Sequence, residues 1–233
     1  MKITLSRIIV TSFAMFSIFF GAGNFILPAF LGRAAGEHWL LVSIAFCLSA
    51  VLIPILGVVV QARLQGSVLD FGKKVSSFVS ILLGCLLYGM CLAFPMPRTA
   101  SVSYEMISAT FAPNLPAWVM YTFYVFYFFL VGYLCFQRNK ILDVLGKYLT
   151  PLMVGIILLL IIVAIFNQGD ITISSFENPI AEGLLEGYQT YDAMSSIIIG
   201  GVIVASLALD NSFDKRQVKR LTIYAGIGSG ILL

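Results

Sequence analysis

Long apolar stretches separated by short polar ones dominate this 233-residue chain. A helix needs about 20 residues to cross a bilayer, and six stretches reach that length. They cover approximately residues 6–32, 38–62, 75–110, 115–136, 141–166 and 183–209. A seventh, at 221–233, is too short to cross. The pattern predicts an all-α polytopic membrane protein, with one transmembrane domain over residues 1–233 that is cut short at its C-terminal end.

Composition strengthens this prediction. The chain is 60% hydrophobic and 11% charged, with a mean hydropathy of +0.99, which excludes an ordinary soluble domain and gives no sign of a nucleic-acid partner. Cys47, Cys85, Cys91 and Cys135 lie inside apolar runs without metal-ligand spacing, and His38 sits at a helix end. We therefore expect packed cysteines, no histidine metal site and no bound cofactor.

The positive charges predict an orientation. If the six spans alternate, twelve of the fourteen Lys and Arg residues lie on one side: Lys2, Arg7, Arg63, Lys73, Lys74, Arg138, Lys140, Lys147, Lys215, Arg216, Lys219 and Arg220. Arg33 lies on the other side and Arg98 within the third span. Because basic loops stay in the cytoplasm, we expect a cytoplasmic N-terminus. The acidic loop from Asn167 to about Glu182 would be outside.

The first span is interrupted at mid-depth by Gly21, Gly23 and Asn24, with Pro28 just after. These residues weaken the helical hydrogen-bond ladder, and unwound backbone is tolerated at that depth only inside protein or beside a cavity. Such a break exposes carbonyl groups for a cation and N–H groups for an anionic group. It predicts a transporter binding site, with a packing kink as the alternative.

The third span is also irregular. Pro95 and Pro97 interrupt it, which predicts a kinked or broken tilted helix. Arg98 and Glu105 follow, seven residues apart and thus on one helical face. Charges at this depth face protein or water. Two interpretations stay open: a structural ion pair or helix contact, and a role in the permeation path.

The sixth span carries the second interruption near the bilayer centre, from Gly187 to Asp192. An intramembrane acid is a functional-site hypothesis by default; the alternative is a hydrogen-bonded aspartate that fixes helix packing. Four spans separate this interruption from the first. In transporters built from inverted repeats, interruptions at corresponding positions of the two halves mark the binding site, and a five-helix repeat fits the spacing.

Three motifs, in this order, carry a family resemblance: Phe19–Pro28, Pro97–Glu105 and Gly187–Met194. They resemble the branched-chain amino acid carrier family, the BrnQ-type cation symporters. The resemblance implies a leucine-transporter-like fold of twelve helices that takes up leucine, isoleucine and valine with sodium at the bacterial cytoplasmic membrane. This chain would hold the first five-helix repeat, helix six and the start of helix seven.

The same resemblance implies the site residues. Substrate would be bound by Phe20, Gly21, Ala22, Gly23, Asn24, Phe25, Tyr88, Tyr188, Gln189, Thr190 and Asp192. Sodium would be bound by Phe19, Asn24 and Thr190. Gly21 to Asn24 would be the unwound part of helix one, and Tyr188 to Asp192 that of helix six. The substrate carboxylate would take N–H groups near Gly23, and its ammonium would take carbonyl groups.

The sequence raises two alternative functions. An intramembrane aspartyl protease needs a second aspartate close to Asp192, but Asp210 and Asp214 lie at the cytoplasmic helix end. A passive channel fits two separate breaks less well than an occluded site does. We therefore expect a transporter and not an enzyme. The sequence leaves open the preferred branched-chain amino acid, sodium or proton coupling, and the oligomeric state.

Overall fold

The computed structural model describes residues 4–111, 116–136, 150–166, 174–209 and 213–233. The side chains of Ala22 and Cys135 lie outside the described part. So do several features of the sequence prediction: the start of the fifth span, part of the acidic loop, and the residues Arg138, Lys140, Lys147, Asp170 and Asp210.

The described residues form helices and no strands. The N-terminal elements are α1 (Leu5–Phe19), α2 (Ala22–Ala35), η1 (Gly36–His38), α3 (Trp39–Cys47), η2 (Leu48–Leu52), α4 (Ile53–Leu64) and α5 (Val68–Lys73). The remaining ones are α6 (Ser77–Ala93), α7 (Pro95–Phe111), α8 (Ala117–Phe136), α10 (Thr150–Phe166), α11 (Pro179–Tyr188), α12 (Asp192–Leu209) and α13 (Lys215–Leu232).

Four helical stretches of the described chain are long and apolar enough to cross a bilayer: Gly23–Leu64, Ser77–Phe111, Ala117–Leu134 and Pro179–Leu209. Leu5–Phe19 and Thr150–Phe166 are shorter apolar helices. The first stretch runs from α2 through η1, α3 and η2 to α4. The chain turns at Gly36, whose φ of 51° suits glycine. The chain is therefore an all-helical, multi-pass membrane protein.

Two clusters of buried side chains hold the helices together. The first joins α1, α4, α12 and α13 through Met15, Phe19, Val58, Ile203 and Ala225, among others. The second joins α2, α3 and η2 through residues that include Leu27, Leu31, Val42, Phe46 and Ala50. The broken pair α1–α2 contributes to both clusters, whereas α12 contributes to the first and α11 packs on α3.

Small residues let α11 approach α3 closely. A Cβ at Gly183 would lie 2.8 Å from Ala45 Cβ, and one at Gly187 would lie 2.7 Å from the Phe46 carbonyl oxygen. The hydroxyl of Ser49 in η2 donates to the Leu184 carbonyl at 2.8 Å. This is the close packing that small residues permit in membrane helices. It fixes α11 and therefore the position of the break that follows it.

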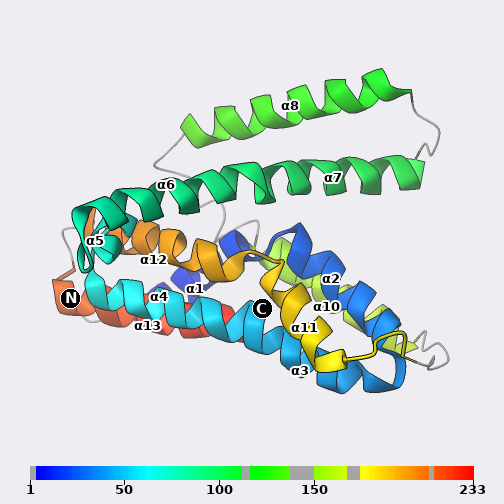
Figure 1. Cartoon of the computed structure of the whole chain (residues 1–233), viewed down its shortest axis with the longest axis horizontal. Coiled ribbons are helices and arrows are strands. Elements are labelled where there is room, and N and C mark those ends of the chain that lie inside the picture. Colours follow the sequence, from blue (N-terminus) through cyan, green and yellow to red (C-terminus); the bar gives the residue numbers. More distant parts are fainter. Residues whose placement is uncertain (1–3, 112–115, 137–149, 167–173, 210–212) are drawn as a thin grey trace.

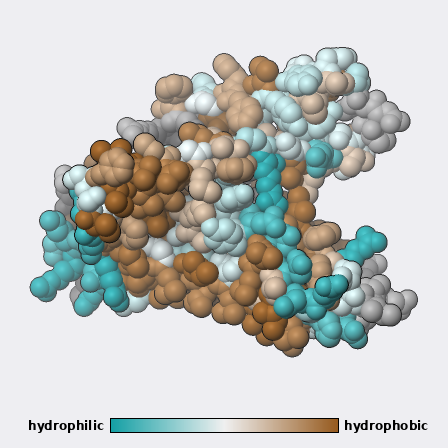
Figure 2. Space-filling view, viewed as in Figure 1, coloured by the Kyte–Doolittle hydropathy of each residue, from teal (hydrophilic) through white to brown (hydrophobic). Residues whose placement is uncertain are grey.

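The remaining helices lie outside this core. In Figure 1, α6 and α7 run end to end along one side of it, with α8 outside them. Many side chains of α8 and α10 are exposed large hydrophobic ones, as expected for surfaces that face lipid. Figure 2 shows apolar side chains over α3, α4 and the start of α6, and hydrophilic ones gathered at the end where α5 lies.

Candidate binding site at two helix breaks

The first break separates α1 from α2. Helix α1 ends at Phe19, the Phe20 N–H donates to the Phe16 carbonyl at 2.7 Å, and the Gly21 N–H donates to the Phe19 carbonyl at 2.8 Å. The break is therefore Phe20–Gly21, shorter than the predicted Gly21 to Asn24, because Ala22 onward already has helical backbone. No side chain caps the start of α2, so its first N–H groups face the break.

The second break separates α11 from α12. Helix α11 ends at Tyr188 and α12 begins at Asp192. Tyr191 has a φ of 63°, a left-handed conformation that is uncommon for a residue with a side chain and recurs at functional sites. The Thr190 hydroxyl donates to the Gly187 carbonyl at 2.9 Å and accepts from the Asp192 N–H at 3.4 Å.

The two breaks meet through Asn24 and Asp192. The Asn24 Nδ2 donates to Asp192 Oδ2 at 2.6 Å and to the Phe19 carbonyl at 2.8 Å. Asp192 is 5% exposed. A Cβ at Gly23 would lie 3.5 Å from Thr190 Cα, so the backbones of the two breaks are also in contact. The structure thus brings together Phe19, Gly23, Asn24, Thr190 and Asp192.

Two hard oxygen atoms, from the Phe19 carbonyl and the Asp192 carboxylate, accept from the same Asn24 amide nitrogen, and the Thr190 hydroxyl lies beside the Asp192 N–H. Such oxygens suit an alkali or alkaline-earth cation. Within the described residues, no cationic side chain pairs with Asp192, and a buried carboxylate needs compensation. The described chain contains no His, Cys, Asp and Glu group that could form a metal centre.

The other predicted site residues lie in different surroundings. The Phe20 ring stacks on Phe16, with centroids 5.1 Å apart. Phe25 and Tyr188 are 38% and 47% exposed. Tyr88 on α6 lines a separate cavity of about 360 Å³ with Gly201 and other residues of α12. The structure does not bring Tyr88 to the breaks.

The structure adds a contact from α6 and α7. Arg98 Nη1 donates to the Gln189 carbonyl at 3.0 Å, and the Phe94 ring stacks on Tyr191 with centroids 5.8 Å apart. Arg98 therefore contacts the second break, and no ion pair with Glu105 is present among the described residues. The sequence analysis does not predict the contact of Phe94 with the second break. The sequence signal for it is Pro95, which interrupts the third span directly after Phe94.

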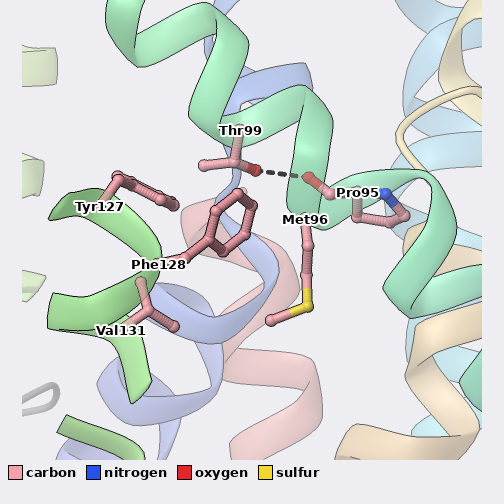
Figure 3. Close-up of a pocket in the computed structure, with 6 residues that line it drawn as sticks. All are labelled: Pro95, Met96, Thr99, Tyr127, Phe128 and Val131. Atoms are coloured by element: carbon pink, nitrogen blue, oxygen red, sulfur yellow. Dashed lines mark hydrogen bonds between the residues drawn. The ribbon is translucent and has the colours of Figure 1, made fainter. Parts of the chain in front are cut away.

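An apolar cavity of about 150 Å³ lies between α7 and α8, beside the same joint. Figure 3 shows its lining: Pro95, Met96, Thr99, Tyr127, Phe128 and Val131. The Thr99 hydroxyl donates to the Pro95 carbonyl at 2.8 Å. Because this hydroxyl is already bonded and the other walls are mainly apolar, the cavity offers little to recognise a charged ligand. We do not include it in the site.

Broken helices that meet at their breaks are a known feature of membrane transporters built from inverted repeats. Residues 4–233 match the family described as branched-chain amino acid transport protein, and the chain belongs to this family. The family is one of transporters and not of enzymes, which argues against the aspartyl protease.

Named relatives agree with this assignment. A protein named branched-chain amino acid permease BraB, from Bacillus subtilis, is 33% identical over 94% of this chain and 51% of its own length. A protein of Staphylococcus haemolyticus named as a branched-chain amino acid carrier is 33% identical over 96% of this chain and 52% of its own length. The chain thus spans about half the length of the curated relatives it matches. No solved structure matches the chain.

Proposed function

We propose that this chain carries the substrate site of a sodium-coupled symporter that takes up branched-chain amino acids. The transporter would act at the bacterial cytoplasmic membrane, with its N-terminus in the cytoplasm. The observation that carries the proposal is the hydrogen bond from Asn24 to Asp192, because it joins two breaks that are separate in sequence. Family membership supports the substrate class.

The fold proposed for the complete protein is the leucine-transporter-like inverted repeat. The support is the position of the breaks: short non-helical segments separate α1 from α2 and α11 from α12, whereas α6 and α7 meet at Phe94 alone and α3 continues into α4 through the π-helix η2. In inverted-repeat transporters such paired interruptions form the substrate site. The 233 residues would then hold the first repeat and the start of the second.

The substrate carboxylate would bind where α2 begins. The N–H groups of Gly23 and Asn24 lie in the first turn of α2, which no side chain caps, and the helix dipole favours negative charge there. The substrate ammonium would bind carbonyl groups at the end of α1 and around Gln189. The zwitterion would thus lie between the ends of two half-helices.

Sodium would bind next to the carboxylate, with ligands from Phe19, Asn24 and Thr190 and with the negative charge of Asp192 beside it. The Asn24 Nδ2 now lies between the Phe19 carbonyl and the Asp192 carboxylate. Both partners are acceptors, so a cation and this amide group would compete for the same two oxygens. A bound cation would attract the substrate carboxylate, which gives the mutual increase in affinity that coupling requires.

The aliphatic side chain of the substrate would contact the rings of Phe20, Phe25 and Tyr188. Leucine, isoleucine and valine differ by a methylene or a branch position, which changes pocket binding by about 1–3 kcal/mol. We therefore expect all three to be substrates, with moderate preference among them.

The test is uptake of labelled leucine by liposomes containing the complete gene product, with an inward gradient of sodium or of potassium. We expect saturable uptake driven by sodium, inhibited by isoleucine and valine, and lost in Asn24→Ala. Gly32→Ala is the matched control in the same helix, because a Cβ at Gly32 would meet nothing within 4 Å. Leucine uptake that is equal in sodium and potassium would contradict the symport proposal.

A further inference from the structure

Arg98 has an unusual position for a charged side chain. It lies in the middle of the apolar stretch Ser77–Phe111 and is partly buried. Its Nη1 donates to the Gln189 carbonyl at 3.0 Å. Charged residues are costly within a span and are retained where they pair with an opposite charge or line a pathway. A neutral carbonyl does not neutralise the positive charge of the guanidinium. We therefore expect an anionic group to bind beside it.

The guanidinium has donors to spare. The arginine side chain carries five N–H donors, and within the described residues the Arg98 guanidinium makes one hydrogen bond, to the Gln189 carbonyl. Glu105, seven residues further along α7, does not pair with it. One nitrogen of the Arg98 guanidinium is therefore held by Gln189, and the other N–H donors can bind a ligand.

That ligand would lie at the two breaks. Gln189 immediately precedes Thr190, and Thr190 Cα lies 3.5 Å from where a Cβ would stand at Gly23 in the first turn of α2. Helices α2 and α7 are in contact. The guanidinium and the uncapped start of α2 thus flank the same short stretch of backbone.

An aromatic contact keeps this geometry in place. The Phe94 ring, at the joint between α6 and α7, stacks on Tyr191 with an interplanar angle of 15°, which holds the joint against the second break. Figure 2 shows the surface hollowed between the α7–α8 side and the side formed by α2, α3 and α11, with hydrophilic side chains at the inner end of the hollow.

We propose that Arg98 is a specificity-determining residue that binds the carboxylate of the amino acid substrate. This rests on the proposed function and adds a second anion-binding group to the start of α2. A guanidinium matches a carboxylate in charge and in planar fork geometry. The hydrogen bond to the Gln189 carbonyl orients the guanidinium. The Arg98 side chain therefore links substrate binding to the backbone conformation of the second break.

The consequence is selection for the free carboxylate. Leucinamide keeps the ammonium and the branched side chain of leucine but has no negative charge. A charge-assisted hydrogen bond is worth about 10–100-fold in affinity. We expect the wild type to bind leucine more tightly than leucinamide by at least about 10-fold. Arg98→Gln should reduce this ratio by weakening leucine alone, and the preference that remains should come from the start of α2.

The test measures binding of both ligands to the purified complete gene product, in the wild type and in Arg98→Gln, Arg98→Lys and Glu105→Gln. Arg98→Lys keeps the charge without the fork and should retain part of the preference. Glu105→Gln removes a charge from the same helix and should leave the ratio unchanged. An unchanged leucine to leucinamide ratio in Arg98→Gln would overturn the proposal, and so would an equal loss of both ligands, which indicates a purely structural role.

A second readout uses the wild type and so does not depend on folding of a variant. Leucine should slow modification of Arg98 by phenylglyoxal, measured by mass spectrometry of the Arg98 peptide, and leucinamide should not. Equal protection by both ligands, or protection by chloride alone, would contradict carboxylate binding. Failure of the proposed function gives a different result, because the wild type would then bind neither leucine nor leucinamide.

Discussion

Asn24 and Asp192 are 168 positions apart in sequence and are joined by a hydrogen bond of 2.6 Å. Each residue stands where the second half of a broken helix begins: Asn24 in the first turn of α2 and Asp192 at the first residue of α12. The bond therefore connects two half-helices directly. A movement of either one changes the surroundings of the buried carboxylate.

The bond should contribute to stability. In Asn24→Ala, the carboxylate of Asp192 would remain buried without its amide donor, which costs about 1–3 kcal/mol. Asp192→Asn keeps an oxygen that can accept from Asn24, so we expect a smaller loss, within about 1 kcal/mol. The midpoint of thermal unfolding in detergent measures the stability loss of each variant. If Asn24→Ala were as stable as the wild type, the bond would not hold the two breaks together.

Glycines on the broken helices should differ sharply in their tolerance of a methyl group. A Cβ at Gly187 would lie 2.7 Å from the Phe46 carbonyl oxygen and 3.2 Å from the Ala50 nitrogen. Since both are backbone atoms, Gly187→Ala should force α11 away from α3, at a cost of about 1–3 kcal/mol.

Gly32→Ala should instead be neutral or slightly stabilising, because alanine is the better helix former by up to about 1 kcal/mol and the site is open. Thermal unfolding of the two variants, measured side by side, checks the difference. Equal unfolding temperatures would mean that the close approach of α11 to α3 is not needed for the fold.

Asp70 lies between two membrane-spanning stretches, in a capping box at the start of α5. Its pKa is lowered to about 2, first by the hydrogen bond from the Ser67 N–H and then by Lys73. The pKa of Asp70 in the folded protein is below its ordinary value of 3.8. The stabilisation from its ionised carboxylate is therefore complete above about pH 4 and is lost as the pH falls through about 2.

Carbon-13 NMR of the Asp70 carboxyl group gives the direct measurement. In Lys73→Ala the pKa should rise but stay below 3.8, because the Ser67 N–H still donates to the carboxylate at 2.8 Å. A wild-type midpoint near 3.8 would show that the capping box is not formed. This effect is local to α5, so transport should not follow it.

The sequence predicts the broken helices better than it predicts their contacts. Gly21, Gly23 and Asn24 weaken a helix wherever they occur, so a break in the first span could be placed within a few residues. Its exact extent could not, because Ala22 to Asn24 remain helical once α2 packs on α3.

Contacts between distant residues depend on packing that no local pattern encodes. The seven-residue spacing predicts that Arg98 and Glu105 share one face of α7. The guanidinium of Arg98 nevertheless donates to the Gln189 carbonyl at the second break. Tyr88 was placed in the site through family resemblance, and it lines a different cavity, toward the other end of α12. The sequence around an aromatic residue in an apolar helix does not show which helix or cavity its side chain contacts.

The central claim is that the two breaks form one site, and a double-mutant cycle on leucine affinity tests it most directly. Leucine binding in sodium would be measured for the complete gene product as wild type, Asn24→Ala, Asp192→Asn and the double variant. If both residues serve one site, the loss in the double variant should fall short of the sum of the single losses by about 1–3 kcal/mol. Losses that add within about 0.5 kcal/mol would mean that the two breaks act separately, and would contradict this account.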